Sequence, residues 1–459
     1  MNRPPAPAPA APAVSVAELD LDASGAPVRL RPAPGAPPVV PGEVYALVRA
    51  AGRPVATVLA RYEDGEDPAR ILAALAAERR TADTALRADA ERRAAEFDAA
   101  AEFGATGESD AAGPATTRAS ATAAGASAPV PRASVVVATR ERPASLARAL
   151  DSLLAQDHPD HELIVVDNAP RTTATRDLVT GGRYARHGVR YVREDRPGLA
   201  AAHNTGVAAA DGEVLAFTDD DVIADPRWLS ALAAPFAADP GLGCVTGLIL
   251  PARLATPAQV LLESHGGFAK GFAPRLYDPA RPPADEPLFP FTAGSFGSGA
   301  NMAFRASALR RAGGFDPATG TGTPARGGDD LYAFVAVLAT GHRLRYTPDA
   351  LVWHHHRETW QDLRNQAYGY GAGLTAYLTA TLVRRPALLP ALLARLPRGL
   401  AHARTMTAAR GGSPGGGVPG AHGTHHHPWP ASLSRLERRG MLHGPAGYLK
   451  ARLTRRSGR

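Results

Sequence analysis

Short apolar runs alternate with helical patterns through the middle of the chain. The runs predict buried strands at 133–139, 162–166, 189–192 and 214–217. Between them, apolar positions at helical spacing predict one helix over Leu146–Leu154 and another over Leu199–Ala210. Strands that alternate with helices favour a parallel sheet with right-handed crossover connections. We therefore expect an α/β domain here.

Polar side chains follow these strands at their carboxyl ends. Thr139, Asp167 and the triplet Asp219–Asp221 stand where three of the strands stop. Open α/β sheets bind ligands at this rim, so we expect these side chains to lie close together. Three adjacent carboxylates resist burial and need water, cationic side chains or a metal ion. A solvated acidic loop is the alternative, and the position at a strand end favours a ligand site.

The rim has the character of a nucleotide site, but it lacks the Gly-x-Gly-x-x-Gly phosphate loop. A bound diphosphate must then be neutralised in another way. A divalent metal held by carboxylates is the obvious means.

The N-terminal part is expected to hold three segments. Residues 1–16 are a Pro/Ala-rich tail, predicted to be disordered. Residues 17–103 form a small α/β appendage, with a hairpin around the Gly-containing turn at 51–54 and a helix from about Asp67. Residues 104–131 are rich in Ala, Ser, Thr, Gly and Pro, which is typical of a flexible linker.

The main domain is predicted over 132–374, and a basic, partly helical extension with a Gly/Pro/His-rich loop over 375–459. Much of the net charge of +7 lies in this extension. A basic tail suggests an anionic partner such as a membrane surface, whereas no recognition motif supports nucleic acid. The broken apolar stretch after Leu374 suits helical pieces that lie on a surface, and packing against protein is the alternative.

Several features favour the cytoplasm, with the inner face of the plasma membrane as a candidate contact. Cys244 is the only cysteine, so no intrachain disulfide is expected. The start of the chain carries no apolar core of a signal peptide, and no apolar stretch is long enough to span a bilayer.

Four motifs together resemble the family 2 glycosyltransferases. They lie at Val135–Pro143, Leu163–Asn168, Arg196–Gly206 and Phe217–Asp221, in the order and spacing of that family. The resemblance covers about Arg132 to Leu374. It implies a GT-A fold, a UDP-, GDP- or dTDP-sugar donor, Mn²⁺ or Mg²⁺ as cofactor, and inversion at the anomeric carbon.

The resemblance also assigns residues to the donor site. Thr139 and Arg140 would line the nucleobase pocket. Asp167 would form a hydrogen bond with the base, and Asp220 would face the ribose or donor sugar. Asp167 alone could also be a turn residue or helix cap. The nucleotide-sugar-binding set implied in this way is Thr139, Arg140, Arg142, Asp167, Asn168, Gly198, Asn204, Asp219, Asp220, Gly299 and Asn301. The family usually carries arginine at the position of His203, so a contact to diphosphate would be weakened here.

The same resemblance assigns Asp219 and Asp221 to the metal. A strand ending at Trp353 delivers three histidines, and alternation puts His354 and His356 on one face. The resemblance favours His354 as the third metal ligand. The later run 425–427 lies in low-complexity sequence and is expected to form no site.

The acceptor side centres on Gly327-Gly328-Asp329-Asp330 before a predicted helix. Acidic residues at a helix N-terminus can simply be favoured by the helix dipole. An inverting transfer, however, needs a base near the acceptor hydroxyl, and the position of Asp330 matches the base of the family. Asp329 replaces a common glutamate, and Tyr332 stands where many relatives carry an acid.

The sequence therefore predicts a metal-dependent, inverting glycosyltransferase with a glycan, lipid-linked or small-molecule acceptor. Cell-envelope glycan, glycolipid or natural-product glycosylation would be its setting. The alternative is a non-catalytic nucleotide-sugar-binding module or an accessory subunit of a glycan assembly complex. A processive synthase would need membrane helices and a Gln-x-x-Arg-Trp segment, and neither occurs.

Overall fold

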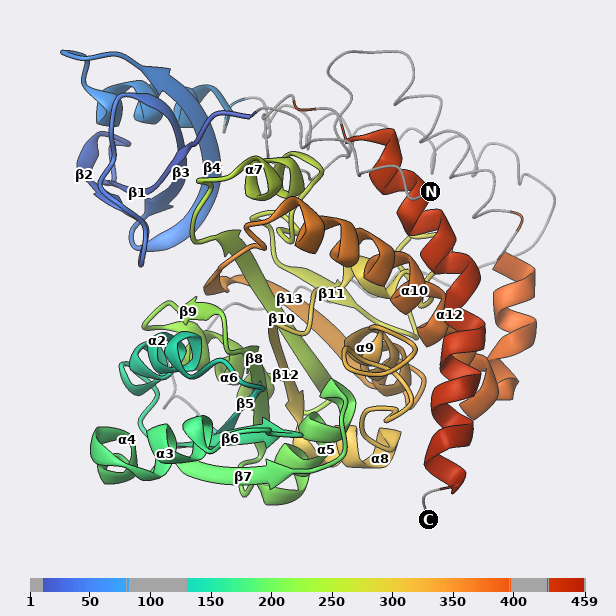
Figure 1. Ribbon diagram of the computed structural model, residues 1–459. Helices are drawn as coiled ribbons and strands as arrows, with labels where there is room; N and C mark the ends of the chain where they lie inside the picture. Colours follow the sequence, from blue (N-terminus) through green and yellow to red (C-terminus); the bar gives the residue numbers. More distant parts are fainter. Residues whose placement is uncertain are drawn as a thin grey trace, which may run out of the picture.

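The computed structural model describes residues 11–79, 81, 130–395, 397, 427 and 429–457. Figure 1 shows a small N-terminal sheet, a larger α/β unit and two long helices towards the C-terminus. The predicted linker at 104–131 lies outside the described residues except for its last two, and most of the Gly/Pro/His-rich loop lies outside them as well.

Four parallel strands form one half of the large sheet, in the order β7-β6-β5-β8. They are β5 (Ala133–Thr139), β6 (His161–Asn168), β7 (Arg190–Glu194) and β8 (Val214–Asp219). All four were predicted from their apolar runs. Their carboxyl ends share one rim, as expected.

The other half of the sheet is mixed. Strand β12 (Asn301–Arg305) joins β8 to β10 (Leu242–Pro251), antiparallel to both. Strand β13 (Arg343–His354) follows, parallel to β10, with the short β11 (Arg275–Tyr277) at the edge. Beyond the acidic triplet, β9 (Val222–Ala224) pairs antiparallel with β13, so that Val222 stands opposite His354.

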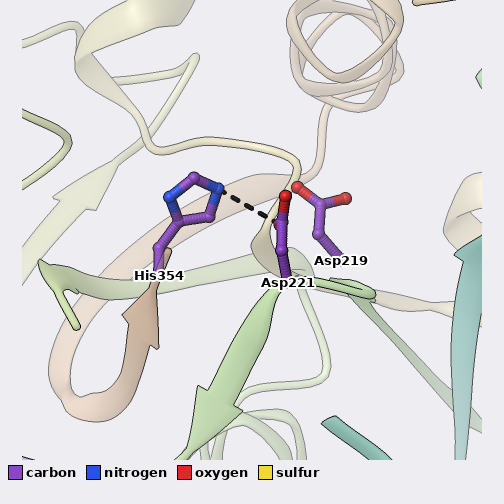
Figure 2. Close-up of side chains that lie close together, drawn as sticks. All are labelled: Asp219, Asp221 and His354. Carbon is purple, nitrogen blue, oxygen red and sulfur yellow. Dashed lines mark ion pairs between the residues drawn. The ribbon is translucent and has the colours of Figure 1, made fainter. Parts of the chain in front are cut away.

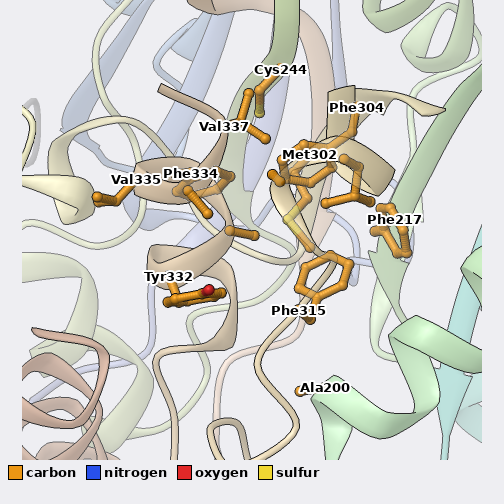
Figure 3. Close-up of a cluster of buried hydrophobic side chains, with 14 of the residues drawn as sticks. Ala200, Phe217, Cys244, Met302, Phe304, Phe315, Tyr332, Phe334, Val335 and Val337 are labelled. Carbon is orange, nitrogen blue, oxygen red and sulfur yellow. The ribbon is translucent and has the colours of Figure 1, made fainter. Parts of the chain in front are cut away.

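Successive side chains along each strand point to opposite faces of the sheet and pack into two hydrophobic cores, one on each face. In β5, Val135 and Val137 enter one core while Val136 and Ala138 enter the other. The first core is covered by α2 (Pro143–Leu154), α3 (Ala174–Thr180), α4 (Gly182–Arg186) and α6 (Trp228–Ala238). The second, drawn in Figure 3, is covered by α5 (Leu199–Ala209), α8 (Ala306–Ala312) and α9 (Asp329–Leu338). The continuous apolar runs are therefore buried on both faces of the sheet, which gives a three-layer α/β architecture.

The N-terminal appendage is a four-stranded sheet in the order β2-β1-β3-β4. Its strands are β1 (Ser15–Leu21), β2 (Pro27–Pro32), β3 (Gly42–Ala50) and β4 (Arg53–Tyr62). The pairing of β3 with β4 matches the predicted hairpin, and residues 68–79 are helical as expected. The first two strands were not predicted, because β1 pairs in parallel with the sequence-distant β3.

The structure corrects the expected boundary of the N-terminal tail. Strand β1 begins at Ser15, and Val14 pairs with Leu254 of the main domain. Val14 and Val16 are buried in a cluster that also contains Leu250 and Trp353. These apolar side chains explain the order, because the cluster joins the small sheet to the large one.

Helix α7 (Pro257–Ser264) lies between β10 and β11 and starts with a capping box made by Thr256 and Gln259. Tyr45 of β3 reaches this helix, where its hydroxyl donates to Glu263. Short 3₁₀ turns occur at Ala293–Ser295 and Pro386–Leu388.

Helix α10 (Trp360–Arg384) runs through the predicted domain boundary at 374, so the main domain does not end there. Helix α12 (Ala431–Ser457), red in Figure 1, packs along α10. Helix α12 thus packs against protein, whereas the two alternatives of packing and surface association were given for the apolar stretch that follows Leu374. Association with a membrane surface stays a prediction. In the part of the chain that the structure describes, every helix is too short or too polar to cross a membrane.

Glycines let α10 and α12 approach closely. A Cβ atom at Gly371 would lie 1.9 Å from the Glu437 carbonyl oxygen, and one at Gly440 would lie 2.1 Å from the Tyr368 carbonyl oxygen. Two non-bonded atoms cannot approach this closely, so the two helix backbones must separate if a side chain is added at either glycine.

We expect Gly371→Ala to destabilise the fold by about 1–3 kcal/mol, the usual cost of overpacking. Gly369→Ala in the same helix is the matched control, since its Cβ would stand 3.7 Å from the nearest atom, the Arg326 carbonyl oxygen. The control should be neutral or slightly stabilising because alanine favours helix. Denaturant unfolding of both variants measures the difference, and equal stabilities would contradict the close packing.

Candidate functional site

Two carboxylates and one imidazole converge at the carboxyl rim of the sheet. Asp219, Asp221 and His354 each offer a ligand atom, and these atoms all lie within 4.8 Å of one another (Figure 2). His354 Nε2 lies 3.3 Å from an Asp221 carboxylate oxygen. The pairing of β9 with the end of β13 creates this geometry, because it brings the acidic triplet beside His354. Oxygen ligands with one imidazole suit Mn²⁺, so the donor set fits a divalent ion.

The two carboxyl groups of the cluster differ in pKa. Burial and the neighbouring Asp221 raise the pKa of Asp219 to about 6. Burial acts in the same direction on Asp221, but His354, Arg357 and Arg142 outweigh it and hold its pKa well below the usual range. Asp221 is therefore the more readily ionised of the two carboxyl groups.

Asp220 is tied to the first strand of the domain. The Thr139 hydroxyl donates to one of its oxygens at 2.6 Å, and Arg142 donates to the other at 2.7 Å. Arg142 also reaches Asp221 at 2.9 Å, so one guanidinium links two members of the triplet. The predicted neighbours Thr139, Arg142 and Asp220 thus come together, while Arg140 is exposed beside them.

Asp167 lies at the end of β6, where the nucleobase contact was predicted. Its carboxyl group is fully buried, and the Tyr191 hydroxyl donates to one oxygen at 3.0 Å. The other oxygen has no hydrogen-bond partner among the described residues. Burial raises the pKa of Asp167. A buried acceptor without a donor is costly, so this oxygen is well suited to accept an N–H group from a ligand.

Asn168 and Gly198 act together in the turn before α5. The Asn168 amide donates to the Arg196 carbonyl at 2.8 Å and accepts from the Gly198 N–H at 2.9 Å. Gly198 has φ 129°, a conformation that favours glycine. Asn168 therefore shapes the turn, and its amide is used within the protein.

Two asparagines that were predicted to bind the donor have structural roles here. Asn204 makes a reciprocal pair with the backbone of Phe315, at 2.8 and 3.0 Å. Asn301 is completely buried, accepts from the Trp228 indole at 2.9 Å and donates to two backbone carbonyls. With both ends of its amide bonded within the protein, Asn301 braces β12.

Asp330 lies in the first turn of α9 and faces the backbone of Gly299. The Gly299 N–H donates to one of its oxygens at 2.8 Å, and the Leu331 N–H donates to the other at 2.8 Å. Burial and the neighbouring Asp329 raise the pKa of Asp330 to about 6. A carboxylate with this pKa is close to the range in which a general base works at neutral pH.

His203 lies in the interior. Its ring is 1% exposed, packs near Phe217 and Phe315, and places Nδ1 3.2 Å from Asp329. The imidazole thus lies beside the neighbour of Asp330, although neither ring nitrogen has a hydrogen-bond partner among the described residues.

The three consecutive histidines make different contacts. His354 joins the cluster, while the backbone N–H of His355 donates to the Asp221 carbonyl at 2.9 Å. His356 lies behind His354 and contacts Glu263 on α7. Burial lowers the pKa of His356. Sequence reasoning missed Glu263, Tyr191 and Arg357, because no motif marks them.

Comparison with known sequences adds an independent finding. The profile described as Glycosyl transferase family 2 matches residues 134–312. The pre-mycofactocin glycosyltransferase of Mycobacterium tuberculosis strain H37Rv is 29% identical over 245 residues, which cover 52% of this chain and 46% of that protein. The validoxylamine A glucosyltransferase of Streptomyces hygroscopicus subsp. limoneus is 37% identical over 130 residues, covering 27% of this chain and 28% of the relative. The chain thus spans less than half the length of these relatives.

Among solved structures, the mannosyltransferase PcManGT from Pyrobaculum calidifontis in complex with GDP-Man and Mn²⁺ aligns with a TM-score of 0.41. The alignment is 21% identical and covers 70% of this chain and 86% of that chain.

We expect Asn301→Ala to lower the free energy of unfolding, because it leaves the Trp228 indole and two carbonyls without their partner. Each buried group left unsatisfied costs about 1–3 kcal/mol. Asn365→Ala is the control, since this exposed amide on α10 should contribute within about 0.5 kcal/mol. Denaturant unfolding compares the two, and an Asn301 variant of wild-type stability with weakened donor binding would restore the original prediction.

Proposed function

Because residues 134–312 form a family 2 glycosyltransferase domain with the GT-A fold, we propose that this chain transfers a sugar from a nucleoside diphosphate to an acceptor hydroxyl with inversion. The observation that carries the proposal is the convergence of Asp219, Asp221 and His354 at the carboxyl rim of the sheet. This is where open α/β sheets bind nucleotides.

In the proposed complex, Asp219, Asp221 and His354 would hold Mn²⁺ or Mg²⁺. When bound, the ion supplies positive charge that offsets the negative charge developing on the leaving diphosphate. The free carboxylate oxygen of Asp167 accepts a hydrogen bond from the base. Arg142 keeps the two carboxylates it contacts in fixed positions before the donor arrives.

Asp330 takes the proton of the acceptor hydroxyl as that oxygen attacks the anomeric carbon. The Gly299 N–H and the start of α9 orient its carboxylate. Burial keeps its pKa near neutrality, so the group can accept a proton from the hydroxyl more readily than an exposed aspartate. Asp329 lies beside it, with one carboxylate oxygen 3.2 Å from His203 Nδ1.

The name of one relative specifies a small molecule, validoxylamine A, so a natural-product acceptor remains within the proposal alongside glycan and lipid-linked acceptors. A non-catalytic nucleotide-sugar-binding module is the competing function. It would retain the donor site and have no need of the raised pKa at Asp330.

The first prediction concerns the metal. Donor and metal should raise each other's affinity by the same factor, because both bind at the acidic cluster. Chelation should abolish transfer, and Mn²⁺ or Mg²⁺ should restore it. Asp221→Ala should remove the coupling, and His354→Ala should weaken it more than His355→Ala does. Calorimetric titration of a nucleoside diphosphate with and without Mn²⁺ measures this, and identical affinities would exclude a metal site.

The second prediction concerns Asp330. Asp330→Asn should reduce transfer by about 10²–10⁴-fold, the usual contribution of a general base, and leave donor affinity almost unchanged. Asp329→Asn should cost less. In the wild type, kcat/KM should fall as the pH drops through about 6, because protonation removes the base.

A stability measurement separates this catalytic loss from misfolding. The pKa of Asp330 is raised on folding, so its ionised form opposes folding above pH 6. Asp330→Asn removes this charge but leaves one of the two backbone N–H groups without an acceptor, so the melting temperature at pH 7 should change little. Transfer at the wild-type rate by a folded Asp330→Asn variant would refute the assignment of the base.

A further inference from the structure

A chain of buried hydrogen-bonding groups runs from the acidic cluster to the N-terminal sheet. His354 Nδ1 lies 3.1 Å from His356 Nδ1, and His356 Nε2 lies 3.1 Å from a Glu263 carboxylate oxygen. The other Glu263 oxygen accepts from the Tyr45 hydroxyl at 3.2 Å. All four side chains are buried, with exposures of 6%, 3%, 4% and 2% in this order. The chain links β13, α7 and β3.

Chemistry restricts how protons can be placed along this chain. A carboxylate only accepts, so an ionised Glu263 requires the proton of neutral His356 to be on Nε2. His356 Nδ1 is then an acceptor, and His354 must donate to it from Nδ1. In a neutral His354 this leaves the Nε2 lone pair directed at the Asp221 carboxylate, 3.3 Å away. Two acceptors at this distance call for a cation between or on them.

A second link joins the N-terminal sheet to the loop that follows the triplet. Arg49 of β3 donates to Asp225 at 2.6 Å and to Glu18 of β1 at 2.7 Å. All three are buried, and Asp225 lies just beyond β9. Arg227 also donates to the Gly52 carbonyl in the turn between β3 and β4. The small sheet therefore contacts both segments that contribute to the acidic cluster.

We propose that the N-terminal sheet is a positioning element for the metal site. Through Tyr45 and Glu263 it fixes the His356 tautomer and, with it, the orientation and free Nε2 of His354. Through Arg49 it holds the loop after Asp221. The inference rests on the proposed metal-dependent function and goes beyond it, because it assigns a role to a part of the chain outside the matched residues 134–312. Groups behind metal-bound histidines typically change metal affinity by about 10–100-fold when removed.

The test measures Mn²⁺ affinity of the full chain by calorimetry and the electron paramagnetic resonance spectrum of bound Mn²⁺. Glu263→Ala should weaken Mn²⁺ binding by about 10–100-fold and alter the spectrum. Glu263→Gln should restore most of the affinity, because its amide oxygen can still accept from His356. Tyr45→Phe should weaken binding to a smaller extent, and Arg49→Met should weaken it as well. Tyr62→Phe is the control, since it removes the same hydroxyl from the same sheet, within the core of that sheet.

A second readout does not depend on the metal. Nitrogen-15 spectra of histidine-labelled, metal-free protein report the His356 tautomer, with the signal identified by its loss in His356→Gln. Glu263→Ala should shift this signal away from the Nε2-protonated form. Folded Glu263→Ala and Tyr45→Phe variants with wild-type tautomer, Mn²⁺ affinity and spectrum would overturn the proposal. If the wild type itself binds no Mn²⁺, the proposed metal function fails, while the tautomer still decides whether the N-terminal sheet positions His354.

Discussion

Three adjacent carboxylates at the end of one strand are the constraint on which the site depends. Their mutual repulsion and burial must be offset, and the offsetting groups come from separate elements. Arg142 follows β5 and bridges Asp220 and Asp221, while His354 and Arg357 approach Asp221 from the end of β13. The short strand β9 makes this possible by pairing with β13 directly after the triplet. Charge balance and sheet register are therefore two aspects of the same arrangement.

The two halves of the large sheet supply different residues of the site. The parallel half supplies Asp167 and Asp220, with Tyr191 and Thr139 as their hydrogen-bond donors. The mixed half and helix α9 supply the other residues of the site, and the Gly299 N–H holds Asp330 in place. Asp330 and Asp219 both have a pKa of about 6, for the shared reason that burial disfavours their charge. Positive charge is therefore favourable beside these carboxyl groups, and a metal ion bound with the donor would supply it.

Bracing residues keep this rim in shape. Asn301 ties β12 to Trp228 and to two neighbouring carbonyls, and Asn204 fastens α5 to the backbone of Phe315. His203 fills the space between the aromatic core and Asp329. The N-terminal sheet extends this bracing to the outer side of His354, because Tyr45, Glu263 and Trp353 lie in or beside the core shared by the two sheets. Fixed geometry of this kind favours ligand binding because little freedom remains to be lost.

The sequence by itself determined the alternating α/β order, the four parallel strands and the acidic triplet at their rim. Short apolar runs and helical spacing are local properties, so they can be recognised without the fold. It also determined the identity of the metal candidates, since Asp219, Asp221 and His354 lie in recognisable motifs. Only the tertiary structure decided that Asn204 and Asn301 serve the interior, that His203 lies beside Asp329, and that β1 and β2 complete a sheet. It alone brought Tyr45 to Glu263, 218 residues apart in the chain. Such contacts depend on which surfaces meet after the chain folds, and no local pattern of side chains encodes that choice.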